Sequence, residues 1–323
     1  MEQIVNQQNV EHITKGHEYL KLASQNKSDN FIINYFCEQQ NIIKKSYNLL
    51  RAGNEFIKGS NIELASMAYL SFMKEYRKTL DKSLIDYLLS FQALQQYINT
   101  CNKFNYIINQ DEVNLFVEFI IENIIGERLA GLSSVQNTVN MIEELLNLVN
   151  NLKLPIGETI ITFFEKEIKP ETDEYLFFEK RYAKIYELIG LNYALSNKEL
   201  AIVYYKIAID NYKKSYSNMD LFRLLKIVSK IQIKNKYYSE ASLAYFNCTI
   251  LSKVFKTHKS YKYYVKYLIC KMIDQNNFDC IKDELETYLK KYTTFINSKE
   301  YKILKDYIEK GEIHNLDAYE YII

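Results

Sequence analysis

A pair of helices that recurs about every 40 residues is the sequence feature that most constrains this chain. Its marker is an alanine followed four residues later by a tyrosine, in three copies: Ala65 with Tyr69, Ala201 with Tyr205, and Ala241 with Tyr245. Residues four apart lie on one face of a helix, so the alanine lets a partner helix approach and the tyrosine fills the adjacent space. The pattern predicts helix packing and points to no chemistry.

The repeat is most regular over residues 179–323. There we expect first helices to begin near residues 179, 219, 259 and 298, and second helices near residues 198, 239, 278 and 315. Residue types that tolerate a left-handed helix end follow the first helices: Asn197, Asn235, Asn276 and Gly311. Earlier helices are expected over residues 5–24, 42–58, 62–79 and 84–99. Three segments do not fit the repeat: 113–125, 135–152, and a short one between the two prolines.

Helix-breaking residues are scarce, which decides the fold class. The 323 residues include only two prolines and eight glycines, too few for the many turns of a β-sandwich or barrel. We predict an all-α, right-handed solenoid of helical hairpins, similar to tetratricopeptide arrays but with a period near 40 rather than 34 residues. Because a stacked array grows without a second core, we expect one elongated domain over residues 1–323. Within it lie N-terminal helices and a first pair (1–100), an irregular helical insertion (101–178) and regular pairs (179–323).

Charge is balanced overall but uneven along the chain. The net charge is +1, yet residues 104–179 hold 14 acidic and 4 basic side chains, and residues 213–310 hold 20 basic and 10 acidic ones. Whole-chain nucleic-acid binding is therefore disfavoured, and the basic part predicts an acidic partner. The lysine- and tyrosine-rich segment 253–271 leaves nucleic acid open as a weaker alternative.

Enzymatic and metal-binding patterns are missing from the sequence. It contains no phosphate-binding glycine loop, nucleophile elbow or zinc-binding His-Glu-x-x-His motif. The five cysteines have no ligand spacing, and His12 and His17 are five residues apart, on different helix faces. No apolar run reaches the length of a membrane span. We expect no cofactor or metal, no enzyme activity, reduced cysteines, and a cytoplasmic protein.

Residues 179–292 resemble the soluble NSF attachment proteins, the SNAP adaptors of vesicle fusion. The resemblance is carried by helix-pair length, loop positions and short motifs: Ile185-Tyr186-Glu187, Ala201-Ile202 with Tyr205, Tyr212-Lys213, Leu224-Leu225, and Tyr238 with Ala241. Segments 264–269, 285–295 and 304–318 are similar to the later pairs of that family.

The resemblance implies an adaptor that packs against a four-helix SNARE bundle and recruits the NSF ATPase. Family members use basic residues on one face against the acidic bundle. When the chain is aligned with the family without gaps between Ala201 and Ala241, Arg223 falls at one such position. Arg181 lies beside another. The implied SNARE-binding residues are Arg181, Lys213, Arg223, Lys253, Lys256 and Lys262.

An apolar cluster lies where the family carries a membrane-contacting loop between its first two helices: Phe31, Ile32, Ile33, Tyr35 and Phe36. Exposed apolar side chains partition into a membrane interface, each methylene contributing about 0.8 kcal/mol. The resemblance thus implies peripheral contact with the cytosolic face of membranes. Alternatively, these residues begin the next helix and are buried.

The chain end departs from the family. Members finish with an acidic, leucine-containing tail that stimulates the ATPase, whereas this sequence ends Tyr321-Ile322-Ile323. We therefore expect a protein that binds SNAREs and could inhibit disassembly, as a divergent paralogue would, or a pathogen's mimic in host cytosol. The alternatives left open are a helical-repeat scaffold with an unrelated protein partner, and a regulator that senses a small peptide in a closed pocket.

Overall fold

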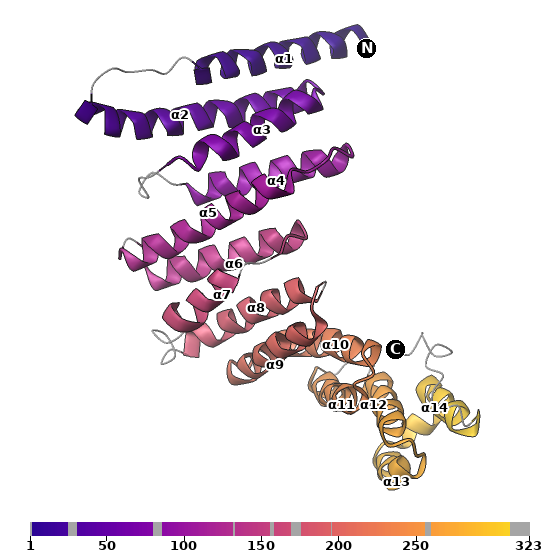
Figure 1. Cartoon of the computed structure of the whole chain (residues 1–323). Helices are drawn as coiled ribbons and strands as arrows, with labels where there is room; N and C mark the ends of the chain where they lie inside the picture. The colour runs from indigo at the N-terminus through magenta and orange to yellow at the C-terminus, as the bar shows by residue number, and fades with distance from the viewer. Residues whose placement is uncertain are drawn as a thin grey trace. The chain divides into compact units, whose positions relative to one another are not determined.

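Helices make up all the regular structure that is described. The computed structural model describes residues 2–24, 31–79, 86–131, 133–155, 158–168, 176–194, 196–255 and 260–310, with backbone alone for residues 2–7, 31–37, 176–177 and 310. Throughout these ranges every regular element is a helix, which confirms the predicted all-α class (Figure 1). The chain divides into two compact units, Met1–Glu171 and Thr172–Ile323. The expectation of a single domain stays a prediction.

The first unit stacks consecutive helices on one another. α1 packs on α2, α2 on α3, and α3 on both α4 and α5, while α6 and α7 extend the stack from α5 (Figure 1). The segments that break the sequence repeat thus also form helices, one of them continuing as a π-helix. The helices are α1 Glu2–Ser24, α2 Phe31–Lys58, α3 Ile62–Tyr76, α4 Tyr87–Lys103, α5 Gln110–Leu129, α6 Val135–Asn151, α7 Glu158–Phe163 and a π-helix Phe164–Ile168.

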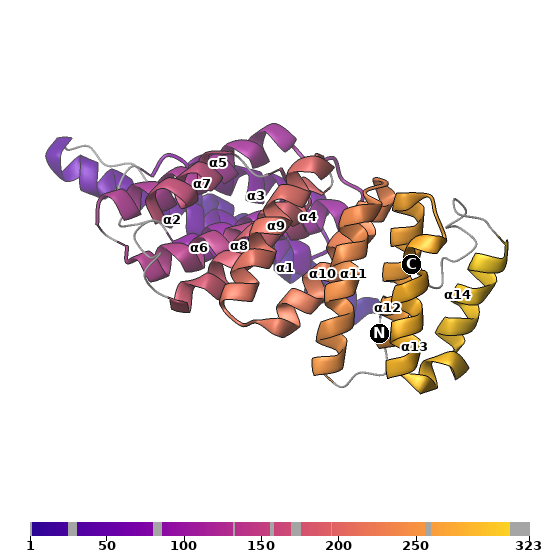
Figure 2. The ribbon, with the colours of Figure 1, turned by 90° about the horizontal axis from the view of Figure 1, so that it is seen from below.

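The second unit is a solenoid of helical hairpins, as predicted. Its elements are α8 Leu176–Tyr193, α9 Lys198–Lys214, α10 Asn218–Lys234, α11 Tyr238–Val254, α12 Ser260–Gln275, α13 Lys282–Lys291 and α14 Lys299–Lys310, with short 3-10 helices Asp279–Ile281 and Thr293–Asn297. The first helices of the pairs begin close to the expected residues. Each helix from α8 to α11 packs on the next, and α14 packs on α12 (Figure 2). The expected last helix near residue 315 lies outside the described residues.

The apolar cluster at residues 31–36 belongs to a helix. α2 begins at Phe31, so the backbone of the cluster forms its first turns and not a loop between two helices. The side chains of Phe31, Ile32, Ile33, Tyr35 and Phe36 lie outside the described residues, so membrane contact and burial both stay predictions. Among the described helices, none combines the length and apolar character that crossing a membrane requires.

In two of its three copies, the alanine–tyrosine marker packs against a glycine of the preceding helix. The tyrosines Tyr69, Tyr205 and Tyr245 are all buried, and so are their alanines. A Cβ atom added at Gly53 would lie 2.5 Å from the Tyr69 ring, and one at Gly190 would lie 2.7 Å from the Tyr205 ring. The Tyr69 and Tyr205 rings therefore occupy the space that a missing side chain leaves on the neighbouring helix.

Buried tyrosines also fix where two helices of the first unit begin. The hydroxyl of Tyr76, at the end of α3, accepts a hydrogen bond from the backbone N–H of Asp86 at 2.7 Å. The hydroxyl of Tyr97 in α4 accepts one from the N–H of Asn109 at 2.9 Å. Asp86 and Asn109 are the N-cap residues of α4 and α5. A core aromatic side chain thereby satisfies a backbone donor at the start of the next helix.

One of the expected left-handed helix ends is confirmed, and two are wrong. Asn276 has φ 47°. Beyond α10, the left-handed residue is Lys236, with φ 63°, while Asn235 has φ −96°. Asn197 serves at the opposite end of a helix, because its side chain caps α9 by accepting from the N–H of Leu200. Gly311 lies outside the described residues.

Replacing Gly190 by alanine tests the packing rule. Gly190→Ala should lower the free energy of unfolding by about 1–3 kcal/mol, because the added methyl group forces the buried Tyr205 ring to move. Urea denaturation of the wild type and the variant measures this change. The double variant Gly190→Ala/Tyr205→Leu should show a favourable coupling energy, since the smaller side chain makes room. Alanine has a higher helix propensity than glycine by roughly 1 kcal/mol. A Gly190→Ala variant that is more stable than the wild type by this amount would contradict the packing rule.

Candidate functional site

A buried carboxylate in the second unit ties three helices together. Glu187 of α8 is 6% exposed. Its carboxylate accepts a hydrogen bond from each terminal guanidinium nitrogen of Arg223 in α10, both at 2.6 Å. It also accepts one from the hydroxyl of Tyr212 in α9 at 2.8 Å. Lys184 lies 3.6 Å from the same carboxylate. Two parallel, charge-assisted hydrogen bonds between Arg223 and Glu187, called the Glu187 fork below, therefore hold two hairpins together.

Electrostatics show that this cluster is ionised. Burial would raise the pKa of Glu187, but the hydrogen bond from Arg223, the charge of Lys184 and the Tyr212 hydroxyl outweigh it and lower the pKa below its ordinary value. The hydrogen bond to Glu187 raises the pKa of Arg223. Burial and the Glu187 charge raise the pKa of Tyr212, which stays protonated and donates. Arg223 thus has a structural partner, although 40% of its side chain is exposed.

The sequence-predicted basic residues do not all have the same role. Lys213 of α9 is exposed and pairs with Asp210 at 3.1 Å, three residues earlier on its own helix. Arg181 of α8 is half-buried. The ammonium nitrogen of Lys253 in α11 lies 4.1 Å from the ring centre of Tyr292 and 4.8 Å from that of Tyr288. Lys256 lies outside the described residues.

Arg223 and Lys262 meet in a basic pocket. It has a volume of about 310 Å³ and is lined by Arg223, Lys226, Ile227 and Lys230 of α10, Tyr245 of α11, and Lys262, Tyr263 and Lys266 of α12. Three of its five cations, Lys226, Lys230 and Lys266, are absent from the sequence-based set. Their helical spacing on two separate helices is the signal that could have found them, because residues three or four apart share a face.

Lys266 is the most unusual cation of the second unit. It is 5% exposed, and its ammonium nitrogen lies 5.1 Å from the ring centre of Tyr245. Burial, and then the charges of Lys262 and Lys230, lower the pKa of this lysine to about 7. Near neutral pH the Lys266 side chain therefore exchanges readily between its charged and neutral forms.

A second cavity beside Lys253 is larger and of mixed charge. It has a volume of about 490 Å³ and is lined by residues of α11, α12 and α13, among them Phe246, Tyr264, Glu284, Tyr288 and Tyr292. The Tyr264 and Tyr288 rings stack with their centres 3.5 Å apart. Aromatic side chains form much of the cavity lining, and carboxylates offset the positive charge of its lysines. The cavity therefore lacks the single charge sign that would attract an acidic partner.

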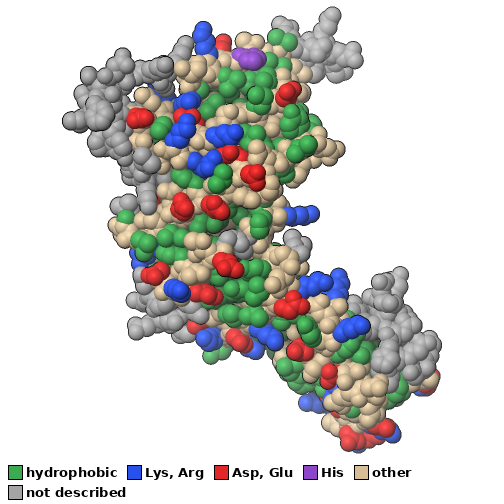
Figure 3. Space-filling model, viewed as in Figure 1, with side chains coloured by type: hydrophobic (Ala, Val, Ile, Leu, Met, Phe, Trp, Pro, Cys, Tyr) green, Lys and Arg blue, Asp and Glu red, His purple; other side chains and the backbone are tan. Residues whose placement is uncertain are grey.

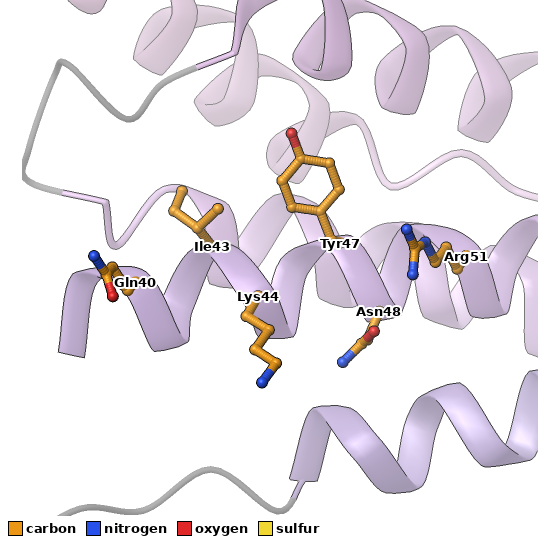
Figure 4. A pocket seen from close by; sticks show the side chains of 6 residues that line it. All are labelled: Gln40, Ile43, Lys44, Tyr47, Asn48 and Arg51. Atoms are coloured by element: carbon orange, nitrogen blue, oxygen red, sulfur yellow. The ribbon is translucent and has the colours of Figure 1, made fainter. Parts of the chain in front are cut away.

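A cavity of about 450 Å³ in the first unit runs along one helix. The described residues that line it all belong to α2: Gln40, Ile43, Lys44, Tyr47, Asn48 and Arg51. Figure 4 shows Tyr47 projecting from one side of α2 and Lys44 from the other. The Tyr47 hydroxyl donates to Asp86 at 3.4 Å, and Arg51 lies 6.0 Å from the Tyr19 ring centre. These side chains do not converge on a common point.

The described histidines have structural neighbours. His12 bonds to Glu55 at 2.7 Å, and the His17 ring packs against Phe56 with ring centres 5.3 Å apart. Within the part of the chain that the structure describes, no group of His, Cys, Asp and Glu could hold a metal ion. On the face drawn in Figure 3, basic side chains are mixed with acidic ones and do not form one continuous stripe.

One known family matches part of the chain. The family described as soluble NSF attachment protein, SNAP, matches residues 178–323. That range coincides with the hairpin solenoid of the second unit and contains Glu187, Arg223 and the basic pocket. No curated protein matches the chain.

Neutralising Glu187 should destabilise the second unit. We expect Glu187→Gln to lower the free energy of unfolding by about 1–3 kcal/mol at neutral pH, because Arg223 loses its charged partner. The folded-state pKa of Glu187 is lowered, so its contribution is present above the ordinary value of 4.5 and is lost as pH falls through the folded-state pKa. Denaturation curves of variant and wild type should therefore converge in acid. The exposed control Glu286→Gln should change stability by less than about 0.5 kcal/mol.

Replacing Lys266 should have the opposite effect. Its lowered pKa means that the unfolded chain binds the proton more tightly, so this lysine destabilises the fold below its unfolded-state pKa, most of all below about 7. Lys266→Met should raise the free energy of unfolding on the order of a few kcal/mol near pH 6, and by less as pH approaches 10. Thermal melts across this range measure the difference. A pH-independent effect, like that expected for the exposed control Lys290→Met, would contradict the assignment.

Proposed function

We propose that this protein is a non-enzymatic adaptor that binds the helical bundle of a SNARE complex, because residues 178–323 match the soluble NSF attachment protein family. Such an adaptor acts at the cytosolic face of membranes. The observation that carries the proposal is the coincidence of the family match with one structural unit, Thr172–Ile323. A solenoid of helical hairpins offers an extended surface, which suits a partner that is itself a long bundle of helices.

Charge supports an acidic partner. Residues 213–310 contain 20 basic and 10 acidic side chains. Lys213 keeps 53% of its side chain exposed, and its pairing with Asp210 within one helix is too weak to hold it away from a partner. Complementary charge at an interface chiefly accelerates association and makes binding sensitive to salt. Salt dependence is therefore the most direct property to measure.

Arg223 requires separate treatment in any mutational test. Its guanidinium is engaged by Glu187 through both terminal nitrogens. Reversing this charge would leave two carboxylates facing each other in a largely buried site and would unfold the unit before it reported on binding. Arg181 and Lys213 are better probes, because neither takes part in the Glu187 fork.

Charge reversal at these two positions should weaken binding. We expect Arg181→Glu/Lys213→Glu to lower the affinity for an assembled four-helix SNARE bundle by about tenfold or more at low salt, and by less at about 0.5 M salt. Isothermal titration calorimetry measures both affinities. The matched control Lys290→Glu/Lys305→Glu carries the same charge change on α13 and α14 and should bind like the wild type. Absence of binding by the wild type at low salt would overturn the proposal.

A disassembly assay then defines what kind of adaptor this is. The protein is added to SNARE complex, NSF and ATP, and bundle dissociation is followed by loss of energy transfer between labelled SNAREs. Acceleration identifies an adaptor that recruits the ATPase. Slowing of a reaction driven by a known SNAP identifies an inhibitor that occupies the bundle. A protein that leaves both reactions unchanged is a helical scaffold for a different partner.

A further inference from the structure

The turn between α4 and α5 presents large apolar side chains to solvent. Ile107 is 90% exposed, Tyr106 is 44% exposed and Phe104 is 43% exposed. Ile108, the next residue along the chain, is partly exposed. Single apolar side chains scattered over a surface are ordinary, whereas several on one loop mark a place where the protein meets something else.

This turn is longer than a helical hairpin of this protein requires. In the turns after α2, α9 and α10, a residue with left-handed backbone directly precedes the N-cap of the next helix: Ser60–Asn61, Tyr216–Ser217 and Lys236–Tyr237. After α4 the left-handed residue is Asn105, with φ 53°, and the N-cap is Asn109. Three residues are thus added, and all three are aromatic or aliphatic: Tyr106, Ile107 and Ile108. Closing the turn does not require them.

Both ends of the added segment are fixed by hydrogen bonds. At its start, the N–H of Tyr106 donates to the carbonyl oxygen of Cys101 at 2.8 Å. At its end, the N–H of Asn109 donates to the hydroxyl of the buried Tyr97 at 2.9 Å. The Asn109 side chain caps α5 by accepting from the N–H of Glu112 at 3.1 Å. The apolar tip is therefore anchored to two helix ends, and little ordering remains to be done when it binds.

The polar groups beside the tip suit a membrane interface. No acidic residue occurs from Lys103 to Gln110, and the single charge in that stretch is positive. The ammonium nitrogen of Lys103 lies 5.2 Å from the ring centre of Phe104. A lysine stem can follow apolar surface while its charged head stays in water, and tyrosine rings gather at the level of lipid headgroups.

The small size of the apolar tip favours a lipid bilayer over a protein partner. Stable protein–protein interfaces bury about 800 Å² on each side, contributed by roughly 20–30 residues that match the partner in shape. Here the apolar side chains are those of Phe104, Tyr106, Ile107 and Ile108 on one short loop. A bilayer is fluid and needs no matching pocket, so a few protruding apolar side chains can enter it.

We propose that this loop, residues 104–108, inserts its apolar side chains into the interface of a lipid bilayer. The segment differs from residues 31–36: α2, α3 and α4 alternate in direction, so the loop lies at the edge of the stack where α2 ends, opposite the edge where α2 begins (Figure 1). A flat membrane that meets one edge lies away from the other. The proposal depends neither on membrane contact by residues 31–36 nor on SNARE binding.

A single tryptophan tests the insertion directly, because the sequence contains none. Full-length Ile107→Trp, mixed with vesicles of phosphatidylcholine and phosphatidylserine, should shift its emission to shorter wavelength. Lipids brominated on their acyl chains should quench it. The control Met67→Trp places the reporter on α3, at another apolar side chain that is 57% exposed, and should show neither change.

Vesicle flotation measures how much the loop contributes to binding. Ile107→Asp should lower the affinity for these vesicles by about tenfold or more, because an apolar side chain that would enter the interface is replaced by a charge. Met67→Asp makes the same kind of replacement on α3 and should change the affinity by less than about twofold. Because Ile107 is 90% exposed, its replacement should leave the circular dichroism melt unchanged.

Three outcomes would overturn the proposal: no spectral shift in Ile107→Trp, equal losses in Ile107→Asp and Met67→Asp, or loss of the shift when Phe31→Ser/Phe36→Ser is added to Ile107→Trp. The last would assign membrane contact to residues 31–36. A shift that persists in this triple variant supports the loop. Ile107→Asp should bind a SNARE bundle in solution as the wild type does, so failure of the SNARE proposal is measured separately.

Discussion

Close approach between paired helices is the constraint on which the rest of the structure depends. At Gly53 and Gly190 the backbone of one helix leaves space that a tyrosine ring of the next helix fills to van der Waals contact. An aromatic ring provides a large buried area at a low cost in side-chain entropy, so in these two hairpins one small–large pair fixes both the separation and the register of the helices. The exposed faces are then free to vary.

The Glu187 cluster adds specificity to that packing. Apolar contacts alone would allow neighbouring hairpins to slide or rotate, because many arrangements bury similar areas. A carboxylate that must receive Arg223 and the Tyr212 hydroxyl together accepts only one arrangement of α8, α9 and α10. The hydrogen bonds to Glu187 also leave less of the positive charge of Arg223 available to a binding partner. In this solenoid Arg223, which aligns with a binding position of the family, also holds the helices together.

The sequence predicted the helical class and the start of most repeats, because both depend on local spacing. Helix ends were harder: the left-handed position beyond α10 falls on Lys236 and not on Asn235, since the length of the helix decides where the turn occurs. The pairing of Glu187 with Arg223, 36 residues apart, depends on how two hairpins rotate against each other. For the same reason, the convergence of Lys230 and Lys266 in one pocket could not be predicted from either helix alone.

Formal charge along the chain is therefore a poor measure of the charge available to a partner. Several cations of the second unit face internal carboxylates, as Lys271 does with Glu284 at 2.8 Å and Lys180 with Asp220 at 3.5 Å. Such pairs cancel much of the field that the composition suggests, and the remaining field depends on where cations gather without nearby acids. Among the described residues, five cations and no acidic side chain line the pocket between α10 and α12, so the basic character of the second unit is concentrated at particular places and is not spread evenly.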